Sequence, residues 1–405
     1  MAVIIICLFS LCKPKQSAVK TITPVAEKKD TSKIEVEPTK PVEPETAEYN
    51  IGFLMPFHLD ENLQPPVNDL EEKEILLSSI PSLQFYEGAK MAVDSFKQEH
   101  LKINLKIFDS GDSAKLETMI RGIRIYNSDL LFVNTSSTNL TGIVKNAEHN
   151  KTALVYAQSA STRNQHLLTC LPNNQTMIIE MADYIARHYT KEKIIVVYRD
   201  VKKEKELGEW FAGRIDSSLA NESSTTDKCT QLNYAIEKTE GLLKKLDKAK
   251  KNLIVIASSD EAFVSPLINT LAENSETYRL QVCGLPTWEN FETVSEVSLE
   301  KLQTIIFTSS FINYGDAELL QFRKEFISKY SADPLLQAYQ GFYLMKGFMT
   351  TMNSDNKNWK DFSKAEKNFN QSLFNFSKGN ADNGFENSHI SVLKFADYQL
   401  QLQPY

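Results

Sequence analysis

The chain has 405 residues, of which 42% are hydrophobic and 24% charged, and its formal net charge is -7. This length predicts two or three domains' worth of core, and the acidic balance argues against nucleic acid or an anionic membrane surface as a partner. The chain has few glycines, no H-E-x-x-H and no C-x-x-C. We therefore expect no nucleotide-loop enzyme, no metal centre and no cofactor.

Residues 1–12 have the pattern of an export signal. An apolar run from Ala2 to Leu11, too short to span a bilayer, leads directly into Cys12, and basic and polar residues follow. This junction resembles the lipobox of bacterial lipoproteins, in which the chain is cut before the cysteine and a diacylglyceryl group is added to its sulfur. The resemblance implies lipidation at Cys12 and a place in a bacterial cell envelope, on the periplasmic side. A cleaved signal without a lipid is the alternative.

Residues 13–48 are expected to form a disordered tether between this signal and a folded body. They are rich in Lys, Glu, Thr, Val and Pro and contain no aromatic residue, so they cannot bury enough apolar surface to fold.

The body from residue 49 onward alternates expected strands and helices. Strands such as 194–197, which reads I-I-V-V, are apolar throughout and not alternating. Such runs indicate parallel sheets covered by helices on both faces, which predicts an α/β fold. In chain order we expect a strand at 51–57, a helix at 85–96, a strand at 103–108, a helix at 114–126, a strand at 130–133, a helix at 139–149, a strand at 153–156, a helix at 176–189, a strand at 194–198, helices at 207–219 and 240–250, a strand at 253–256, a helix at 262–274, strands at 280–283 and 302–307, helices at 318–330 and 336–349, and a strand at 390–395.

Two motifs at the start of the body resemble the type I periplasmic binding proteins. The strand at 51–57 carries the family's G-x-L-x-P pattern, and residues 85–94, which read F-Y-E-G-A-K-M-A-V-D, match its first helix. Polar turns after later strands, a late helix from Tyr339 to Phe348 and a closing segment at 380–395 follow in family order. The resemblance implies two doubly wound parallel-sheet lobes joined by a three-strand hinge.

The resemblance also implies how the chain is divided between the lobes. Lobe 1 is expected at 49–166 plus 303–372, and lobe 2 at 167–302 plus 373–405. The hinge crossovers would then lie near His166, Leu302 and Ser372.

Ligands of open α/β sheets bind at the carboxyl ends of the strands, which would line a cleft between the lobes. In amino-acid-binding relatives, hydroxyl and amide groups of the third and fourth strand loops hold a carboxylate, and an acidic residue of lobe 2 meets the ammonium. Serines and threonines that only cap helices are the alternative. The positions that match the carboxylate site are Ser136, Ser137, Ser161 and Thr162, and those that match the acid are Asp200 and Asp260. The full set of expected ligand-binding residues is His58, Asn134, Ser136, Ser137, Gln158, Ser159, Ser161, Thr162, Asp200, Asp260 and Tyr314.

Three function classes follow. The first is an envelope-anchored solute-binding protein that captures a small polar ligand, such as an amino acid or a peptide, by hinge closure for an ABC-type importer. The second is a non-transport envelope protein that binds a cell-wall synthesis partner, like the activators of peptidoglycan synthases. The tether and an acidic, proline-containing insertion at 60–82 favour this second class, whereas the hydroxyl groups at strand ends and the paired acids of lobe 2 favour the first, which is the class we expect.

The third class is an enzyme. Residues 109–113 read D-S-G-D-S and resemble the G-D-S block of an esterase family, with Ser113 as nucleophile and His389 as base. A helix cap at Asp112 or Ser113 is the alternative, and we expect no enzyme.

The three cysteines of the body, Cys170, Cys229 and Cys283, are expected to be small buried hydrophobic residues, and a disulfide between one pair of them is left open.

Overall fold

The computed structural model describes residues 46–64, 75–96, 101–162, 164–222, 228–355, 358–362, 366–378 and 384–404. The signal with Cys12, nearly all of the tether and the middle of the 60–82 insertion lie outside these ranges. Within them, every helix is too short or too polar to cross a lipid bilayer.

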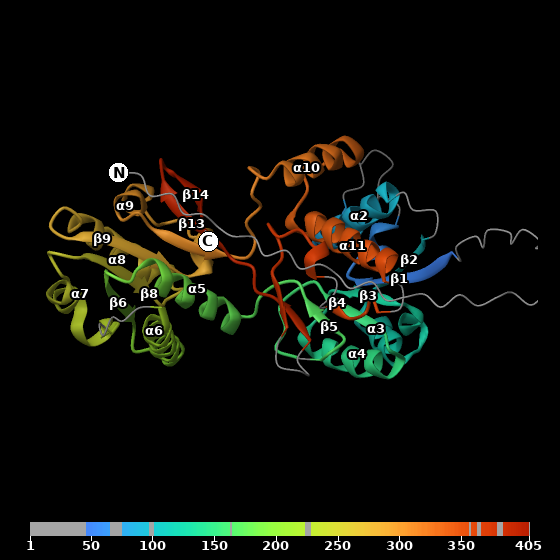
Figure 1. Cartoon of the computed structure of the whole chain (residues 1–405), viewed down its shortest axis with the longest axis horizontal. Helices are drawn as coiled ribbons and strands as arrows, with labels where there is room; N and C mark the ends of the chain where they lie inside the picture. Colours follow the sequence, from blue (N-terminus) through green and yellow to red (C-terminus); the bar gives the residue numbers. More distant parts are fainter. Residues whose placement is uncertain are drawn as a thin grey trace, which may run out of the picture. The chain divides into compact units, whose positions relative to one another are not determined.

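The described chain forms two seven-stranded sheets with helices around each (Figure 1). The first sheet has the order β11-β12-β5-β4-β3-β1-β2 and the second the order β14-β13-β10-β9-β8-β6-β7. Neighbouring strands run parallel, except that β11 is antiparallel to β12 and β13 is antiparallel to both β10 and β14. The strands of the first sheet are β1 (Ala47–Met55), β2 (Leu101–Asp109), β3 (Leu130–Val133), β4 (Ala153–Tyr156), β5 (Leu167–Thr169), β11 (Phe376–Lys378) and β12 (Phe385–Asn387). Those of the second are β6 (Lys193–Tyr198), β7 (Thr230–Asn233), β8 (Lys251–Ile256), β9 (Arg279–Gly284), β10 (Ile305–Thr308), β13 (Ser391–Ala396) and β14 (Gln399–Gln403).

Both sheets place their first five strands in the same order, second-first-third-fourth-fifth, so the expected pair of doubly wound α/β lobes is confirmed. Several of the helices begin at a side-chain cap of the kind that local sequence favours, such as Asp112, Asn173 and Asp316. The first lobe holds the helices α1 (Leu59–Asn62), α2 (Ile80–Ser95), α3 (Ser113–Arg121), α4 (Ser137–Asn150), α10 (Ala317–Tyr330) and α11 (Leu336–Ser354). The second lobe holds α5 (Asn174–His188), α6 (Lys202–Glu222), α7 (Tyr234–Lys245), α8 (Glu261–Glu273) and α9 (Glu296–Lys301).

The chain passes between the sheets three times, as expected, but at other residues. The strand at 167–169 belongs to the first sheet and not to the second, and β10 belongs to the second sheet, where it pairs with β9 and β13. The crossings therefore follow β5, β10 and β12, and not His166, Leu302 and Ser372. An apolar run looks the same in either sheet, so the sequence indicated a strand at 302–307 without indicating its partners. The three-residue strand at 167–169 was not predicted.

The first lobe has an aromatic core on one face of its sheet. Successive side chains of β1 point to opposite faces, so that Ile51, Phe53 and Met55 pack toward α2 and α11 while Leu54 packs on the α3 and α4 side. The ring of Phe53 stacks on that of Phe132 at a centroid distance of 5.1 Å.

The helices α2 and α11 pack with their backbones in close approach. A Cβ atom added to Gly88 would lie 2.0 Å from the carbonyl oxygen of Ala338, and one added to Gly341 would lie 2.0 Å from that of Phe85. Each glycine therefore lets the opposite helix come closer than any other residue would.

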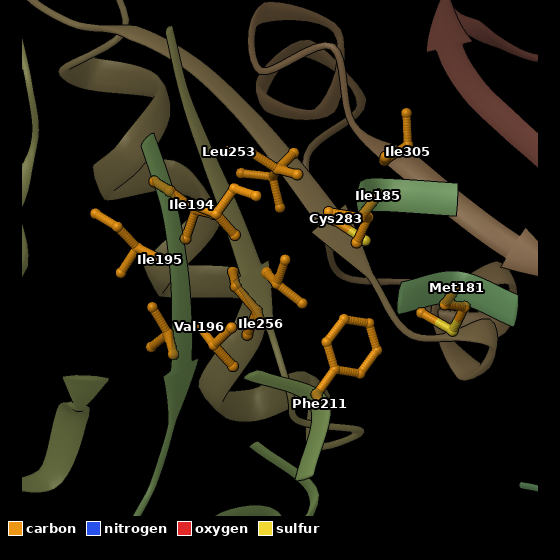
Figure 2. Close-up of a cluster of buried hydrophobic side chains, with 14 of the residues drawn as sticks. Met181, Ile185, Ile194, Ile195, Val196, Phe211, Leu253, Ile256, Cys283 and Ile305 are labelled. Atoms are coloured by element: carbon orange, nitrogen blue, oxygen red, sulfur yellow. The ribbon is translucent and has the colours of Figure 1, made fainter. Parts of the chain in front are cut away.

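The second lobe has an aliphatic core. Strands β6 and β8 form part of this core, and side chains of α5 and α6 pack against them (Figure 2).

All three cysteines of the described residues are free thiols, and burial raises the pKa of each. The expectation of small buried hydrophobes holds for Cys170 and Cys283, whereas Cys229 is half-buried.

The third crossing is fixed by a fully bonded amide. Asn387, which is 1% exposed, donates from Nδ2 to the carbonyl oxygens of Cys170 and Leu373 and accepts at Oδ1 from the N–H groups of Asn375 and His389. The first and third crossings are thus joined through one side chain, because Cys170 begins the first and His389 lies in the third.

Candidate functional site

A pocket of about 340 Å³ lies at the carboxyl ends of β8, β9 and β10. The first crossing and the first turns of α5 form another part of its wall, and Ser159, from the loop after β4, reaches it from the first sheet. Eight apolar and five neutral polar residues line it, and none is charged. They are Ser159, Leu171, Pro172, Asn174, Met177, Ile178, Met181, Leu207, Ser259, Leu285, Pro286, Thr287 and Ser309.

Three of the polar residues of this pocket, Ser259, Thr287 and Ser309, follow consecutive strands of the second sheet. Thr287 Oγ1 donates to Ser259 Oγ at 3.0 Å, which links the loops after β9 and β8. Behind them the indole N–H of Trp288 donates to the carbonyl oxygen of Ser258 at 2.9 Å and fixes the loop backbone. The pocket therefore combines an apolar floor with a few oriented hydroxyl groups, the usual make-up of a small-molecule site.

The expected carboxylate site in the first lobe is only partly assembled. Ser136 caps α4, since its Oγ accepts from the N–H of Asn139 at 3.4 Å, while Ser137 is the exposed first residue of that helix. Gln158 Nε2 lies 2.5 Å from Asn134 Oδ1, so the structure brings together these two amides from neighbouring strand ends.

The remaining expected residues of the first lobe are dispersed. Ser161 is exposed and Thr162 half-buried in the loop after β4. His58 lies after β1 in the left-handed region with φ 49°, and its Nδ1 is 3.3 Å from Glu61. Tyr314 lies beyond β10 under the Arg323 guanidinium, 5.3 Å from its ring centroid.

The expected acids of the second lobe differ from each other. Asp200 is exposed after β6, whereas Asp260 caps α8 and accepts from Arg199 at 2.7 Å. Arg199 also binds Glu204 through two nitrogens, and Glu204 in turn accepts from Ser258 at 2.7 Å. A ligand's ammonium would thus have to compete with Arg199 for Asp260.

This ionic network sets the charge states of its carboxyl groups. The hydrogen bond from Arg199 holds the pKa of Asp260 below its usual value. Burial alone would raise the pKa of Glu204, but the bonds from Arg199 and Ser258 outweigh it and lower that pKa. Both groups are therefore anionic at neutral pH, and the network occupies the point where the strand order of the second sheet reverses, between β6 and β8.

The D-S-G-D-S block is structural. Burial would raise the pKa of Asp109, but bonds from four backbone N–H groups, among them those of Gly111 and Leu59, lower it. Asp112 caps α3, and Ser113 begins that helix. Ser113 follows β2 and His389 follows β12, five strand positions away in the same sheet, on the order of 24 Å. The esterase interpretation is wrong because these two groups cannot meet.

Of the expected ligand-binding residues, Ser159 is the one that lines the pocket among the described residues. Sequence reasoning missed the others because Leu285, Met177 and Leu171 look like ordinary core residues. Their common signal is position, directly after a strand or at the start of a helix, and it becomes useful only once the strand partners are known.

Comparisons with known proteins give structural relatives only. No protein-family model matches the chain, and no curated protein matches it. A Rhodospirillum rubrum protein named as a branched-chain amino acid ABC transporter superposes with a TM-score of 0.60 at 11% identity, covering 88% of this chain and 100% of its own. An ABC-type branched-chain amino acid transporter from Rhodopseudomonas palustris gives 0.55 at 12% identity, with 88% and 95% covered. A branched chain amino acid ABC transporter periplasmic ligand-binding protein from Burkholderia xenovorans gives 0.53 at 13%, with 88% and 94% covered.

Each of these superpositions covers 88% of this chain. The chain therefore has the fold of the type I periplasmic binding proteins, and the fold class expected from the motifs at 51–57 and 85–94 is confirmed.

Proposed function

We propose that this chain is a solute-binding protein that captures a small ligand in the pocket at the carboxyl ends of β8, β9 and β10. The observation that carries the proposal is the composition of that pocket's wall, which joins strand ends of the second sheet, the first crossing and Ser159 of the first lobe. A ligand there contacts both lobes and the segment between them. Its binding would favour one arrangement of the lobes by hinge closure.

The lining points to a ligand with an apolar body and a polar end, such as an amino acid or a short peptide. Side chains such as Met177, Ile178 and Leu285 would cover the apolar part, and the hydroxyl groups of Ser259 and Thr287 would bind the polar end. The named functions of the structural relatives, which are ABC transporters for branched-chain amino acids, support this ligand class and an ABC-type permease as the partner.

The proposal includes a lipid anchor at Cys12 and a place on the periplasmic side of the cell envelope. It rests on the apolar run before Cys12 and the aromatic-free stretch that follows. Expressed in a bacterium fed with a radiolabelled fatty acid, the chain should incorporate label and sediment with membranes. Cys12→Ala should remove both properties, and label that persists in this variant would contradict the anchor.

A thermal-shift screen of the full chain in detergent tests the capture of a solute. Amino acids, short peptides, sugars and muropeptides would each be added at millimolar concentration. A ligand present at a hundred times its dissociation constant adds about 2.7 kcal/mol to the folded state, which should raise the melting temperature by several degrees. No shift from any class would overturn the proposal and direct attention to partner proteins of the envelope.

Matched variants locate the ligand once a shift is found. Ser259→Ala with Thr287→Ala removes two hydroxyl groups of the pocket, and Ser137→Ala with Ser161→Ala removes two from the site that the sequence predicted. Because each lost hydrogen bond costs about 1 kcal/mol, the first pair should weaken binding roughly tenfold or more and the second pair should leave it unchanged. The opposite result would place the ligand on the first lobe.

A further inference from the structure

The second sheet ends in a strand that carries no charge. Among the described strands β14 pairs with β13 alone, so its other side is an open edge of the sheet (Figure 1). The strand reads Q-L-Q-L-Q, and Leu402 is 40% exposed. An open edge presents backbone N–H and C=O groups to the outside and can therefore accept one more strand.

The other three edge strands of the described chain are protected against such pairing. β2 is long but carries Lys102 and Lys106, and β11 and β7 have three and four residues. Lysine on a long edge and a short length both disfavour the addition of a strand. β14 is longer than β7 and β11 and has no lysine, so it is the edge that is most open to pairing.

The backbone groups of Leu400 and Leu402 point to this open edge. The N–H of Phe395 in β13 donates to the carbonyl oxygen of Thr304, directly before β10, so the backbone groups of Phe395 face away from β14. Phe395 is paired with Leu400, and this pair is therefore a non-hydrogen-bonded one. Because the direction alternates along a strand, the backbone groups of the three glutamines face β13 and those of the two leucines face outward.

The sequence of β14 is the same in both directions, which suits pairing with an identical strand. When two copies run antiparallel about a two-fold axis through Gln401, Leu400 of each copy lies opposite Leu402 of the other. These are the residues with outward backbone groups, so each of the two leucine pairs exchanges two hydrogen bonds. Apolar side chains then meet apolar ones, amides meet amides, and no charge is buried.

The pairing is limited at both ends of the strand. Pro404, which follows β14, has no N–H to donate and would lie opposite Tyr398 of the second copy. Tyr398 is 62% exposed in the turn between β13 and β14, where its ring can cover the proline. Two strands of five residues form a smaller interface than the roughly 1,000 Å² of a stable complex, so we expect a weak association that depends on concentration.

We propose that β14 is an interaction surface for a second copy of this chain, through antiparallel pairing of the two β14 strands about Gln401. The second sheets of the two copies would then form one continuous sheet. β13 separates β14 from β10, the nearest strand whose end borders the ligand pocket. The inference therefore does not rest on the proposed function.

The first test removes hydrogen bonds between the copies. It uses the full chain with Cys12→Ala as the parent, so that an acyl anchor makes no contribution, and measures the dissociation constant of the dimer by analytical ultracentrifugation at rising protein concentration. Leu402→Pro removes an outward N–H but no bond to β13, and by symmetry it removes one bond from each leucine pair. It should weaken association at least tenfold, whereas Leu402→Ala, which keeps the N–H, should have a smaller effect.

The second test depends on Gln401 meeting its own counterpart. Gln401→Lys and Gln401→Glu should each weaken association about fivefold, because like charges then lie directly opposite each other. An equimolar mixture of the two should associate at least as strongly as the parent, since lysine then faces glutamate. Gln231→Lys, on the other edge strand of the same sheet, is the matched control and should change association less than twofold.

Three results would overturn the proposal. They are a parent that stays monomeric at every concentration, a Leu402→Pro variant that associates as well as Leu402→Ala, and a mixture of the Gln401 variants that associates no better than each alone. Unchanged melting temperatures verify that the variants are folded. If Leu402→Pro does not fold, the mixture of the two Gln401 variants decides.

Discussion

The two lobes share one strand order but are built with different chemistry. The first has an aromatic core and a pair of helices, α2 and α11, whose backbones touch through Gly88 and Gly341. The second has a core of Ile, Val and Leu, with the charged network of Arg199 at the ends of β6 and β8, whereas the first sheet has an amide pair at the ends of β3 and β4. The same topology is therefore compatible with two packing solutions, because it requires only apolar strands covered by helices on both faces.

The two lobes also differ in where their closest contacts lie and in what their strand-end side chains do. In the first lobe the closest contacts lie inside the core, between helices, and most polar side chains at the strand ends cap or brace loops. In the second lobe a pocket with oriented hydroxyl groups lies at the carboxyl ends of β8, β9 and β10. We infer that the first lobe is mainly a rigid support and that the second carries most of the recognition chemistry.

The largest effect that would break this comparison is expected at the helix contact. Gly341→Ala should destabilise the protein by about 3 kcal/mol, because the new Cβ would lie 2.0 Å from a backbone oxygen of Phe85 and the helices must move apart. Denaturation by guanidinium chloride, followed by circular dichroism, measures the change.

A glycine of the second lobe provides the control. Gly213 lies within α6, where an added Cβ would meet nothing within 4 Å. Gly213→Ala should therefore leave stability unchanged or raise it by up to about 1 kcal/mol, since alanine favours the helix. Equal losses in both variants would show that the close approach of α2 and α11 has no special role.

Sequence patterns were sufficient for elements that are long and apolar. The strand expected at 194–198 is observed as β6 from Lys193 to Tyr198, and the helix expected at 318–330 is α10 from Ala317 to Tyr330. Short apolar strands such as β3 and β4 were predicted, but polar strands and strands of three residues were not. β7, which reads T-Q-L-N, lies at the edge of the second sheet and carries no apolar run that would mark it as a strand.

The sites were less predictable than the elements, for a physical reason. Ser159, which the sequence predicted as a ligand-binding residue, lines the pocket, whereas Leu285 and Met177 reach it only through the tertiary fold. Composition near strand ends indicates where a site lies, and long-range pairing decides which residues enter it.

A smaller effect is expected between β6 and β8, where the strand order of the second sheet reverses, and it would sharpen the comparison of the two lobes. Arg199→Met should destabilise the protein by about 1–2 kcal/mol at pH 7, because Glu204, whose side chain is 12% exposed, loses its cation and keeps the bond from Ser258. The lost ion pair between Arg199 and Asp260 adds less to this destabilisation, because the side chain of Asp260 is 42% exposed and water screens the pair.

The pH dependence distinguishes this ionic origin from a loss of packing. The pKa of Glu204 is lowered in the folded state, so its contribution is present above the unfolded pKa of 4.5 and is lost as the pH falls through the folded value. The stability gap between the native chain and Arg199→Met should therefore narrow between about pH 5 and pH 3. Arg214→Met, which breaks the pair with Asp183 on the helices α5 and α6, is the matched control. This pair is more exposed than that of Arg199 with Glu204, so its loss should cost under about 1 kcal/mol. A gap that stays constant down to pH 3 would instead assign the effect to the packing of Arg199 over the Phe263 ring, 4.9 Å away.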